Sequence, residues 1–181
     1  ESYHESDQFA LAVTTYQAID LTHIAAQNHP GLLYRMADAQ LRAGNKEAAL
    51  DTFNLFITEH PGHPQITNAI VNRAEIFLEK ADTNSAHKEF DRLIKKTARS
   101  AQKEYAWAQK AILYKKTIDT SEDGKVRLGA LDSFAQCHLR LLADFPERAN
   151  AKQATSHFWL GWSLYRLDRF AECIMPFQQA R

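Results

Sequence analysis

Two pairs of adjacent residues combine a nucleophile with a base. Cys137 precedes His138, and Ser156 precedes His157, and a histidine can activate a thiol or a hydroxyl for covalent catalysis. Adjacent residues of a helix point about 100° apart, however, so neither pair can hydrogen-bond as a catalytic couple without a third group. The glycines are scattered along the chain and form no phosphate-binding loop. We therefore predict no catalytic residues and no enzymatic activity.

Histidines also raise the question of a metal site. His60 and His63 flank a Pro-Gly turn with Glu59 beside them, and His87 lies four residues before Asp91, which is a spacing that two ligands on one helix face can have. A tetrahedral site needs further ligands, and neither group has another His, Cys or acidic cluster near it in the sequence. We interpret them as turn residues and as a surface pair, and we expect no metal and no cofactor.

The overall charge argues against a protein that binds nucleic acid or anionic lipid through a large net positive charge. The chain of 181 residues carries 22 Lys and Arg against 22 Asp and Glu, so no excess of basic charge attracts nucleic acid or anionic lipid. It also has no run of apolar residues long enough to span a bilayer. The first residue is Glu1, and we expect the chain to be a fragment of a longer polypeptide.

One stretch departs from this balance. Residues 88–116 hold nine basic residues and three acidic ones. Five of the nine basic residues lie in the helix predicted at 83–98 or directly after its end, and they are expected to form a solvated outer face: Lys88, Arg92, Lys95, Lys96 and Arg99. An acidic protein partner remains an alternative.

The elements that position these residues are predicted to be helices throughout. Apolar residues recur at spacings of three and four, as at Leu50, Phe53 and Ile57, and no alternation of period two is sustained. Pro, Gly and Asn clusters divide the chain at intervals. The predicted helices are 7–25, 32–42, 46–59, 65–80, 83–98, 101–118, 125–144, 150–167 and 169–180.

An internal repeat runs through these helices. Ala12, Ala49 and Ala86 are each 37 residues apart, and each lies four residues before an aromatic residue. Two further copies follow at intervals of 44 and 43 residues, with Ala130 before Phe134 and Cys173 before Phe177. The first helices of the repeats carry a second series of small residues, Ala37, Ala74, Ala108 and Gly161. Both cysteines occupy apolar positions, so buried thiols are expected and a Cys137–Cys173 disulfide is not.

These spacings resemble the tetratricopeptide repeat, a helix-turn-helix unit. The second copy carries the motif best, with Leu33, Met36, Ala37, Gly44, Ala49, Phe53 and Pro61 at the family's positions. Small residues let two antiparallel helices approach closely, and the next pair covers the apolar side that each pair leaves bare. The resemblance implies an all-α, right-handed superhelical solenoid of about nine helices with a concave groove. We predict a single array over 1–181, with repeats at about 1–28, 29–62, 63–98, 99–146 and 147–181.

The copies differ in length and in one proline. About ten residues are inserted around Ile118 to Lys125 and about nine more between Ala130 and Gly161, so a polar turn or a helical extension is expected there. Pro176 falls inside the last predicted helix, where it should bend or break that helix.

Aromatic and charged residues at groove-facing positions of the repeat are the candidate binding site. Aromatic side chains give a large contact area at low entropic cost, and an alternative is that the two Trp rings are buried against the helix at 126–145 or against a further repeat. The predicted partner-binding residues are Tyr34, Arg35, Asp38, Arg42, Asn72, Glu75, Trp159, Trp162 and Tyr165.

The predicted function is a non-catalytic scaffold for protein–protein interaction that binds a peptide or partner domain in this groove. The phrases at 60–64 and 145–148 are similar to repeats of bacterial envelope proteins, including outer-membrane assembly lipoproteins and the accessory factor of the Tol-Pal system. That similarity implies a periplasmic location, with a cytoplasmic one as the alternative. The alternative functions are a regulatory or docking domain of a larger enzyme and a self-assembly module that associates through its uncapped ends.

Overall fold

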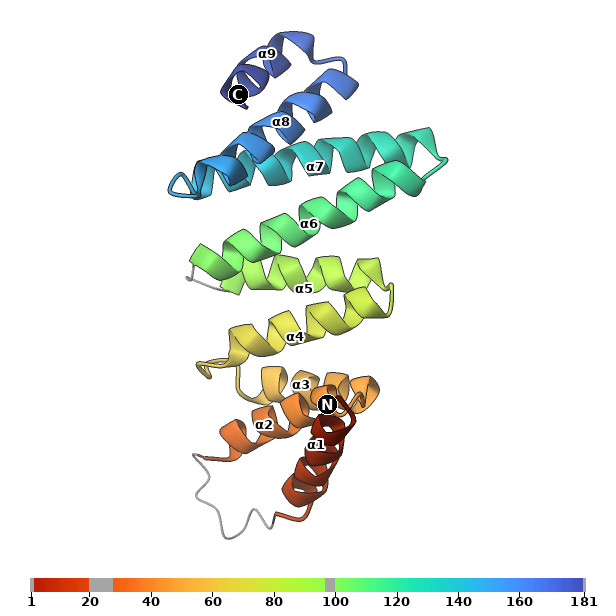
Figure 1. The fold of residues 1–181 in the computed structure, drawn as a ribbon, viewed down its shortest axis with the longest axis vertical. Helices are drawn as coiled ribbons and strands as arrows, with labels where there is room; N and C mark the ends of the chain where they lie inside the picture. Colours follow the sequence, from red (N-terminus) through yellow and green to blue (C-terminus); the bar gives the residue numbers. More distant parts are fainter. Residues whose placement is uncertain (1, 20–27, 97–99, 181) are drawn as a thin grey trace. The chain divides into compact units, whose positions relative to one another are not determined.

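The computed structural model describes residues 2–19, 28–96 and 100–180, and these residues form nine helices and no strand. Figure 1 shows the helices following one another along the chain, joined mostly by short connections. The all-α fold class predicted from the periodicity is confirmed. The helices are α1 (Ser2–Gln17), α2 (His29–Arg42), α3 (Lys46–Glu59), α4 (Ile66–Glu79), α5 (Thr83–Lys96), α6 (Ser100–Thr120), α7 (Gly124–Asp144), α8 (Asn150–Arg166) and α9 (Phe170–Gln179).

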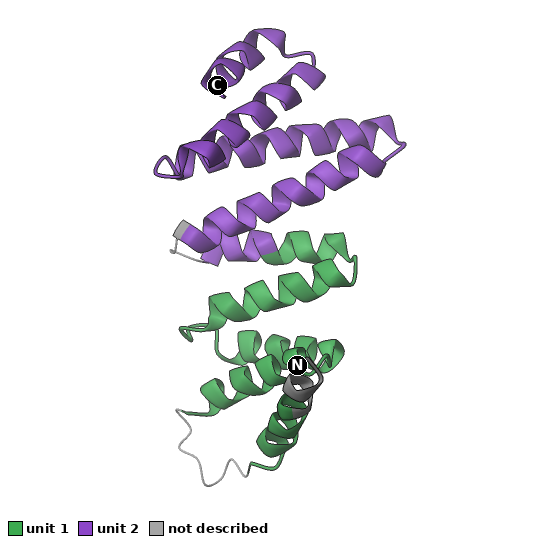
Figure 2. Cartoon of the chain, viewed as in Figure 1, with its two compact units in different colours: residues 1–89 green, residues 90–181 purple. Residues whose placement is uncertain are grey.

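Contacts divide the chain into two compact units, residues 1–89 and residues 90–181, with the boundary inside α5 (Figure 2). Unit 1 contains α1 to α4 and the first half of α5. Unit 2 contains the second half of α5 and α6 to α9. The single array over 1–181 remains a prediction.

Most predicted helix boundaries agree within two residues, and the first two helices are the exceptions. The first helix was predicted at 7–25 but ends at Gln17, and residues 20–25 lie outside the described residues. The second helix begins at His29 and contains Pro30 in its first turn. A proline is tolerated there because the N–H it lacks would have no partner within the helix. The predicted start of this helix at residue 32, which treated Pro30 as a helix breaker, was therefore three residues too late.

The insertion around Ile118 to Lys125 is mainly a helical extension. Both α6 and α7 have 21 residues, whereas α3 has 14, and only residues 121–123 separate the two long helices. The Asp123 carboxylate accepts hydrogen bonds from the backbone N–H groups of Lys125 (2.8 Å) and Val126 (3.2 Å). This cap defines the start of α7 and keeps the connection short.

Pro176 does not break the last helix. The α9 helix continues through Pro176 to Gln179, and the proline is buried. Its ring costs the helix one backbone hydrogen bond, and burial of the ring against apolar neighbours offsets part of that cost.

Within unit 1, the small and aromatic residues of the repeat form the core. Ala37, Ala49 and Ala74 are fully buried, as are Phe53 and Phe56. One polar pair lies among them, because the Thr52 hydroxyl donates a 2.7 Å hydrogen bond to the side-chain oxygen of Gln40. The predicted role of the alanines as sites of close helix approach agrees with this burial.

Two apolar clusters lie among the described residues of unit 2. The first packs residues of α6 and α7, including Phe134 and Cys137, against Trp159 and Trp162 of α8. The second joins α7, α8 and α9 and includes Cys173 and Phe177. A Cβ atom on Gly161 would lie 2.9 Å from the Phe177 ring, so the glycine makes room for that aromatic ring. Both cysteines are buried free thiols.

One small residue of the first-helix series differs from the others in burial. Ala37, Ala74 and Gly161 are buried, but Ala108 is only half-buried, whereas Ala106 and Ala111 of the same helix are buried. Ala108 lies in the wall of a groove.

Three helix pairs share one turn geometry. Gly44, Ala81 and Asp168 follow α2, α4 and α8, and their φ angles are 81°, 57° and 59°. After each, the next N–H bonds back across the helix end, as from Asp82 to the Phe77 carbonyl (2.9 Å). This pattern closes a helix on a left-handed residue. Gly44 adopts this conformation without steric cost, and Ala81 and Asp168 adopt it in the other two copies.

Candidate functional site

A groove of about 780 Å³ opens in unit 2 between α6 and α8, over one face of α7. We call it the α6–α8 groove. The α7 helix packs against both α6 and α8. The side chains of these three helices do not fill the space between α6 and α8, and this space is the groove. Its volume is within the usual range for ligand-binding pockets. The groove is lined by Ala108, Ala111, Ile112, Lys115, Lys116, Asp119, Thr120, Phe134, His138, Leu141, Arg148, Ala151, Lys152, Thr155, Ser156 and Trp159.

The floor of the groove comes from α7. Phe134, His138 and Leu141 are spaced at i, i+4 and i+7, so they share one face of that helix, and all three are buried. Small residues of α6 and the Trp159 ring of α8 form the adjoining walls, with Trp159 5.7 Å from the Phe134 ring. The floor can therefore receive apolar side chains.

His138 is the unusual residue of this floor. It is only 7% exposed, and neither ring nitrogen has a hydrogen-bond partner among the described residues. Burial, together with the nearby positive charge of Arg148, lowers the pKa of His138 to about 4. The ring is consequently neutral near pH 7, with one N–H donor and one acceptor nitrogen. Leaving such a group unpaired costs about 1–3 kcal/mol.

Arg148, just before α8, lines the groove beside this histidine. Its guanidinium donates to the Glu104 carboxylate of α6 (2.9 Å) and to the Ser156 hydroxyl (2.9 Å), and its side chain is 9% exposed. Lys152 reaches the same carboxylate oxygen at 3.3 Å. Burial acts to raise the pKa of Glu104, but hydrogen bonds and charges from Lys152 and Arg148 outweigh it and lower that pKa. The Glu104 carboxylate thus forms ion pairs with two cations, Arg148 and Lys152.

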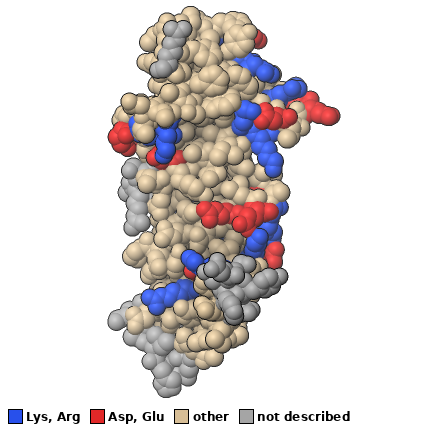
Figure 3. Space-filling view, in the orientation of Figure 1, with Lys and Arg blue, Asp and Glu red and all other residues tan. Residues whose placement is uncertain are grey.

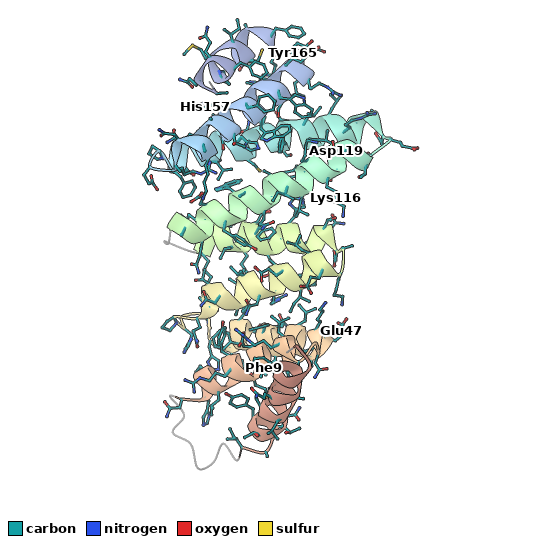
Figure 4. The ribbon with its side chains drawn as sticks, viewed as in Figure 1. Phe9, Glu47, Lys116, Asp119, His157 and Tyr165 are labelled. Atoms are coloured by element: carbon teal, nitrogen blue, oxygen red, sulfur yellow. The ribbon has the colours of Figure 1, made fainter. Side chains whose placement is uncertain are left out.

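The α6 wall carries two more lysines. The Lys115 ammonium bonds to Asp119 at 2.6 and 2.7 Å and lies 5.5 Å from the Trp159 ring and 5.6 Å from the Trp162 ring. It therefore crosses from α6 to α8 and bounds the groove. Lys116 is exposed, and its side chain has no ion-pair partner in the part of the chain that the structure describes. Figure 4 labels Lys116 and Asp119, which lie near the C-terminal end of α6.

The three predicted site residues of α8 have different surroundings. Trp159 lines the groove. Trp162 packs with the first core cluster, 6.3 Å from the Phe134 ring, with the Arg166 guanidinium 5.5 Å from its own ring. Tyr165 is 54% exposed, lies outside the groove lining and contacts Phe170 of α9 at 5.4 Å. Of these three residues, Trp159 alone lines the α6–α8 groove.

The six predicted residues of unit 1 lie on α2 and α4. Tyr34 packs against Phe53 (5.9 Å) and Phe56 (5.6 Å). Burial and the charge of Asp38 raise the pKa of Tyr34, although hydrogen bonds with Asn72 and Asn68 act to lower it.

Their charged members are more solvated. Asp38 pairs with Arg42 at 2.9 Å, and the Arg42 guanidinium lies 5.4 Å from the Phe9 ring. Arg35 is exposed and Glu75 is half-buried. Hydrogen bonds and ion pairs therefore join Tyr34 to Asn72 and Asp38 to Arg42 on this surface.

Sequence reasoning missed the cations and the histidine of the α6–α8 groove. Lys115 and Lys116 belong to the basic stretch at 88–116, but only the five basic residues at 88–99 were assigned to a solvated outer face, and these two lysines were given no role. His138 was considered only as a base beside Cys137. The i, i+4, i+7 spacing of Phe134, His138 and Leu141 was the available signal, because it places a histidine on an otherwise apolar face.

The remaining chemistry-bearing residues have structural roles. Burial raises the pKa of Cys137 to about 12, so its reactive thiolate form is strongly disfavoured. His60 and His63 pack on the Phe56 ring at 6.0 and 5.2 Å, and Asp91 pairs with Lys110. Within residues 8–19, 28–96 and 101–180, no cluster of three His, Cys, Asp or Glu side chains could hold a metal ion.

Similarity to solved structures shows the fold. BtubC (BKLC) from P. vanneervenii matches with a TM-score of 0.64 at 15% identity, over 99% of this chain and 71% of that one. The MamA protein matches with a TM-score of 0.59 at 13% identity, over 99% and 87%. A putative kinesin light chain from Podosopora anserina with TPR-like repeats gives 0.56 at 14% identity, over 99% and 89%. The predicted tetratricopeptide-like fold is confirmed.

Sequence comparison identifies the family. No curated protein sequence matches the chain. The family described as outer membrane lipoprotein, YfiO, matches residues 26–159, which is well over half of the chain. None of the described helices is long and apolar enough to cross a membrane. From the family match, the chain belongs to the YfiO family of outer membrane lipoproteins.

Proposed function

We propose that this protein is a non-catalytic scaffold that binds a segment of a partner protein in the α6–α8 groove. The observation that carries the proposal is the groove itself, whose apolar floor is bordered by cationic side chains. An apolar floor supplies affinity through burial, and charged borders orient the bound segment. Trp159 is the aromatic anchor, and Trp162 supports it from the core.

The family suggests where this scaffold acts. YfiO is a family of outer membrane lipoproteins, and we place this chain in the bacterial envelope on the periplasmic side. Tyr34, Arg35, Asp38, Arg42, Asn72 and Glu75 of unit 1, together with Tyr165, are proposed as a secondary surface that contacts the partner more weakly than the α6–α8 groove does. Figure 3 shows acidic and basic side chains mixed on the face in view, which suits recognition by local contacts.

The experiment obstructs the groove without disturbing the core. Ile112 lines the groove and is 60% exposed, and Leu128 of α7 is 53% exposed but does not line it. Ile112→Arg should abolish co-purification of the partner with the full-length protein in its native host, and Leu128→Arg should not. Equal retention of the partner by both variants would refute the proposal, provided that both show native helical circular dichroism.

Self-assembly is the second candidate function, and one observation favours it. Phe170, Ile174 and Met175 of α9 are large apolar side chains that are more than half exposed. Such a surface on one short helix is typical of an interface. Sedimentation velocity at rising protein concentration should show dimers that Ile174→Glu abolishes. A monomer at every concentration would exclude this candidate.

A further inference from the structure

The charge of the α6–α8 groove indicates the chemistry of its occupant. Its lining contains four cations and one carboxylate, Asp119. Glu104 behind the lining brings the total to two carboxylates for four cations. The chain as a whole has a formal net charge of zero, so the excess of positive charge is local to this groove.

The two surplus charges lie on different helices. Asp119 neutralises Lys115, which leaves Lys116 of α6 exposed beside the groove. Glu104 is shared by Arg148, whose side chain is buried, and by Lys152, whose side chain is 62% exposed. Lys116 and Lys152 can therefore both turn toward an incoming negative charge, one from each wall of the groove.

The floor and walls between these lysines favour apolar groups. Ile112, Phe134, Leu141 and Trp159 supply aliphatic and aromatic surface. His138 adds an imidazole whose nitrogens have no hydrogen-bond partner among the described residues, and a peptide main chain offers both a donor and an acceptor to such a ring. Because neighbouring atoms cover both nitrogens in the structure, the ring must rotate to make these bonds.

We propose that the groove binds an acidic amphipathic peptide segment of a partner protein, with carboxylates on Lys116 and Lys152 and apolar side chains on the floor between them. This inference rests on the proposed function. Nucleic acid fits less well, because backbone recognition needs a stripe of cations that contacts several phosphates, and only two cations here are uncompensated.

The test selects peptides without assuming a partner. A random peptide library displayed on phage is panned on the whole protein, and binders that an Ile112→Arg variant fails to retain are sequenced. The proposal predicts enrichment of Asp and Glu together with Leu, Phe or Trp. Enriched peptides without acidic residues would overturn this inference and leave the proposed function standing, whereas failure to obtain any groove-dependent binder would count against both.

Charge variants then test the two lysines. Fluorescence anisotropy with the most enriched peptide should show binding at least about tenfold weaker for the double variant Lys116→Gln/Lys152→Gln. The matched control Lys95→Gln/Lys125→Gln changes two exposed lysines of unit 2 that do not line the groove, and it should bind as the unmodified protein does. Equal weakening by both double variants would overturn the assignment.

A single-stranded oligonucleotide is the competing probe. The proposal predicts that it binds far more weakly than the peptide at physiological salt and does not displace it. Displacement of the peptide by the oligonucleotide at similar concentration would assign the groove to nucleic acid and overturn the inference.

Discussion

The α2–α4 surface of unit 1 and the α6–α8 groove of unit 2 both present aromatic and charged side chains, but they differ in how these side chains are paired. In unit 1, Tyr34 bonds with Asn72 and Asp38 pairs with Arg42. In unit 2, Glu104 forms ion pairs with both Arg148 and Lys152, and the ring nitrogens of His138 have no hydrogen-bond partner among the described residues.

The polar groups of the α2–α4 surface therefore satisfy one another, whereas the α6–α8 groove has polar groups left for a ligand. Polar groups that satisfy one another gain little from a partner, whereas a buried unpaired group and a local excess of charge both cost free energy that a ligand can recover. Groove geometry alone would not make the distinction, because the repeat presents equivalent positions in both units.

The largest expected effect concerns pH and His138. Its pKa is about 4 in the folded protein and about 6.5 when unfolded. Between these values the unfolded chain binds the proton, so the stability contributed by the neutral ring is fully present above about pH 6.5 and is lost as the pH falls toward 4. The loss should reach about 3 kcal/mol.

The measurement is urea unfolding at several pH values in the unmodified protein and in His138→Leu. The difference between the two removes the contributions of other titrating groups. If the unmodified protein and His138→Leu differ in their free energy of unfolding by the same amount at about pH 7 and pH 4, His138 is not buried as a neutral ring.

The next effect compares an arginine from each unit. Arg148→Ala should lower the free energy of unfolding by about 2–3 kcal/mol, because it leaves partly buried Glu104 with only the 3.3 Å contact to Lys152. Arg42→Ala removes an exposed ion pair and should cost less than about 1 kcal/mol. Chemical denaturation of both variants checks the order, and equal costs would refute the distinction between the units.

Histidine replacements should have opposite signs in the two units. His138→Leu removes an unpaired polar group and should raise the free energy of unfolding by about 1 kcal/mol near neutral pH. His63→Leu in unit 1 should lower it by about 1 kcal/mol, since the Nδ1 atom of His63 accepts a hydrogen bond from the Gln65 N–H (3.2 Å). Thermal unfolding of the two variants measures both signs, and destabilisation by His138→Leu would show that the ring has a partner.

The smallest effect concerns the turn after α4. Ala81 has a φ of 57° where the equivalent residue after α2 is Gly44. Ala81→Gly should therefore be stabilising by up to about 1 kcal/mol, and Gly44→Ala should be destabilising by about 1 kcal/mol. Denaturation midpoints would show this reciprocity, and a loss of stability in both variants would contradict it.

The periodicity of the sequence predicted the helices because helical repeat proteins are stabilised by local pairs. Ala49 and Phe53 lie on one face at i, i+4, and both are fully buried. The error at Pro30 arises because proline is accepted in the first turn of a helix, where its missing N–H has no partner to lose. Pro176 could bend or break α9 by its sequence, and the helix continues through it with the ring buried.

The candidate groove was only partly predictable. Trp159 follows from the repeat frame, and it does line the groove. Lys115 and Arg148 come together although 33 residues separate them, and neither occupies a motif position, so only the packing of α6, α7 and α8 shows that they border one space. The pairing of Asp38 with Arg42 is local and could have been read from their i, i+4 spacing.

Site-specific photo-crosslinking tests the central claim most directly. A photoreactive amino acid is placed at Ile112 in the groove, at Leu128 on the same unit outside it, or at Arg35 on the α2–α4 surface, all of which are exposed. The account predicts that a partner protein is captured strongly from Ile112 and only weakly from the other two positions. Strong capture from Arg35 with none from Ile112 would contradict it.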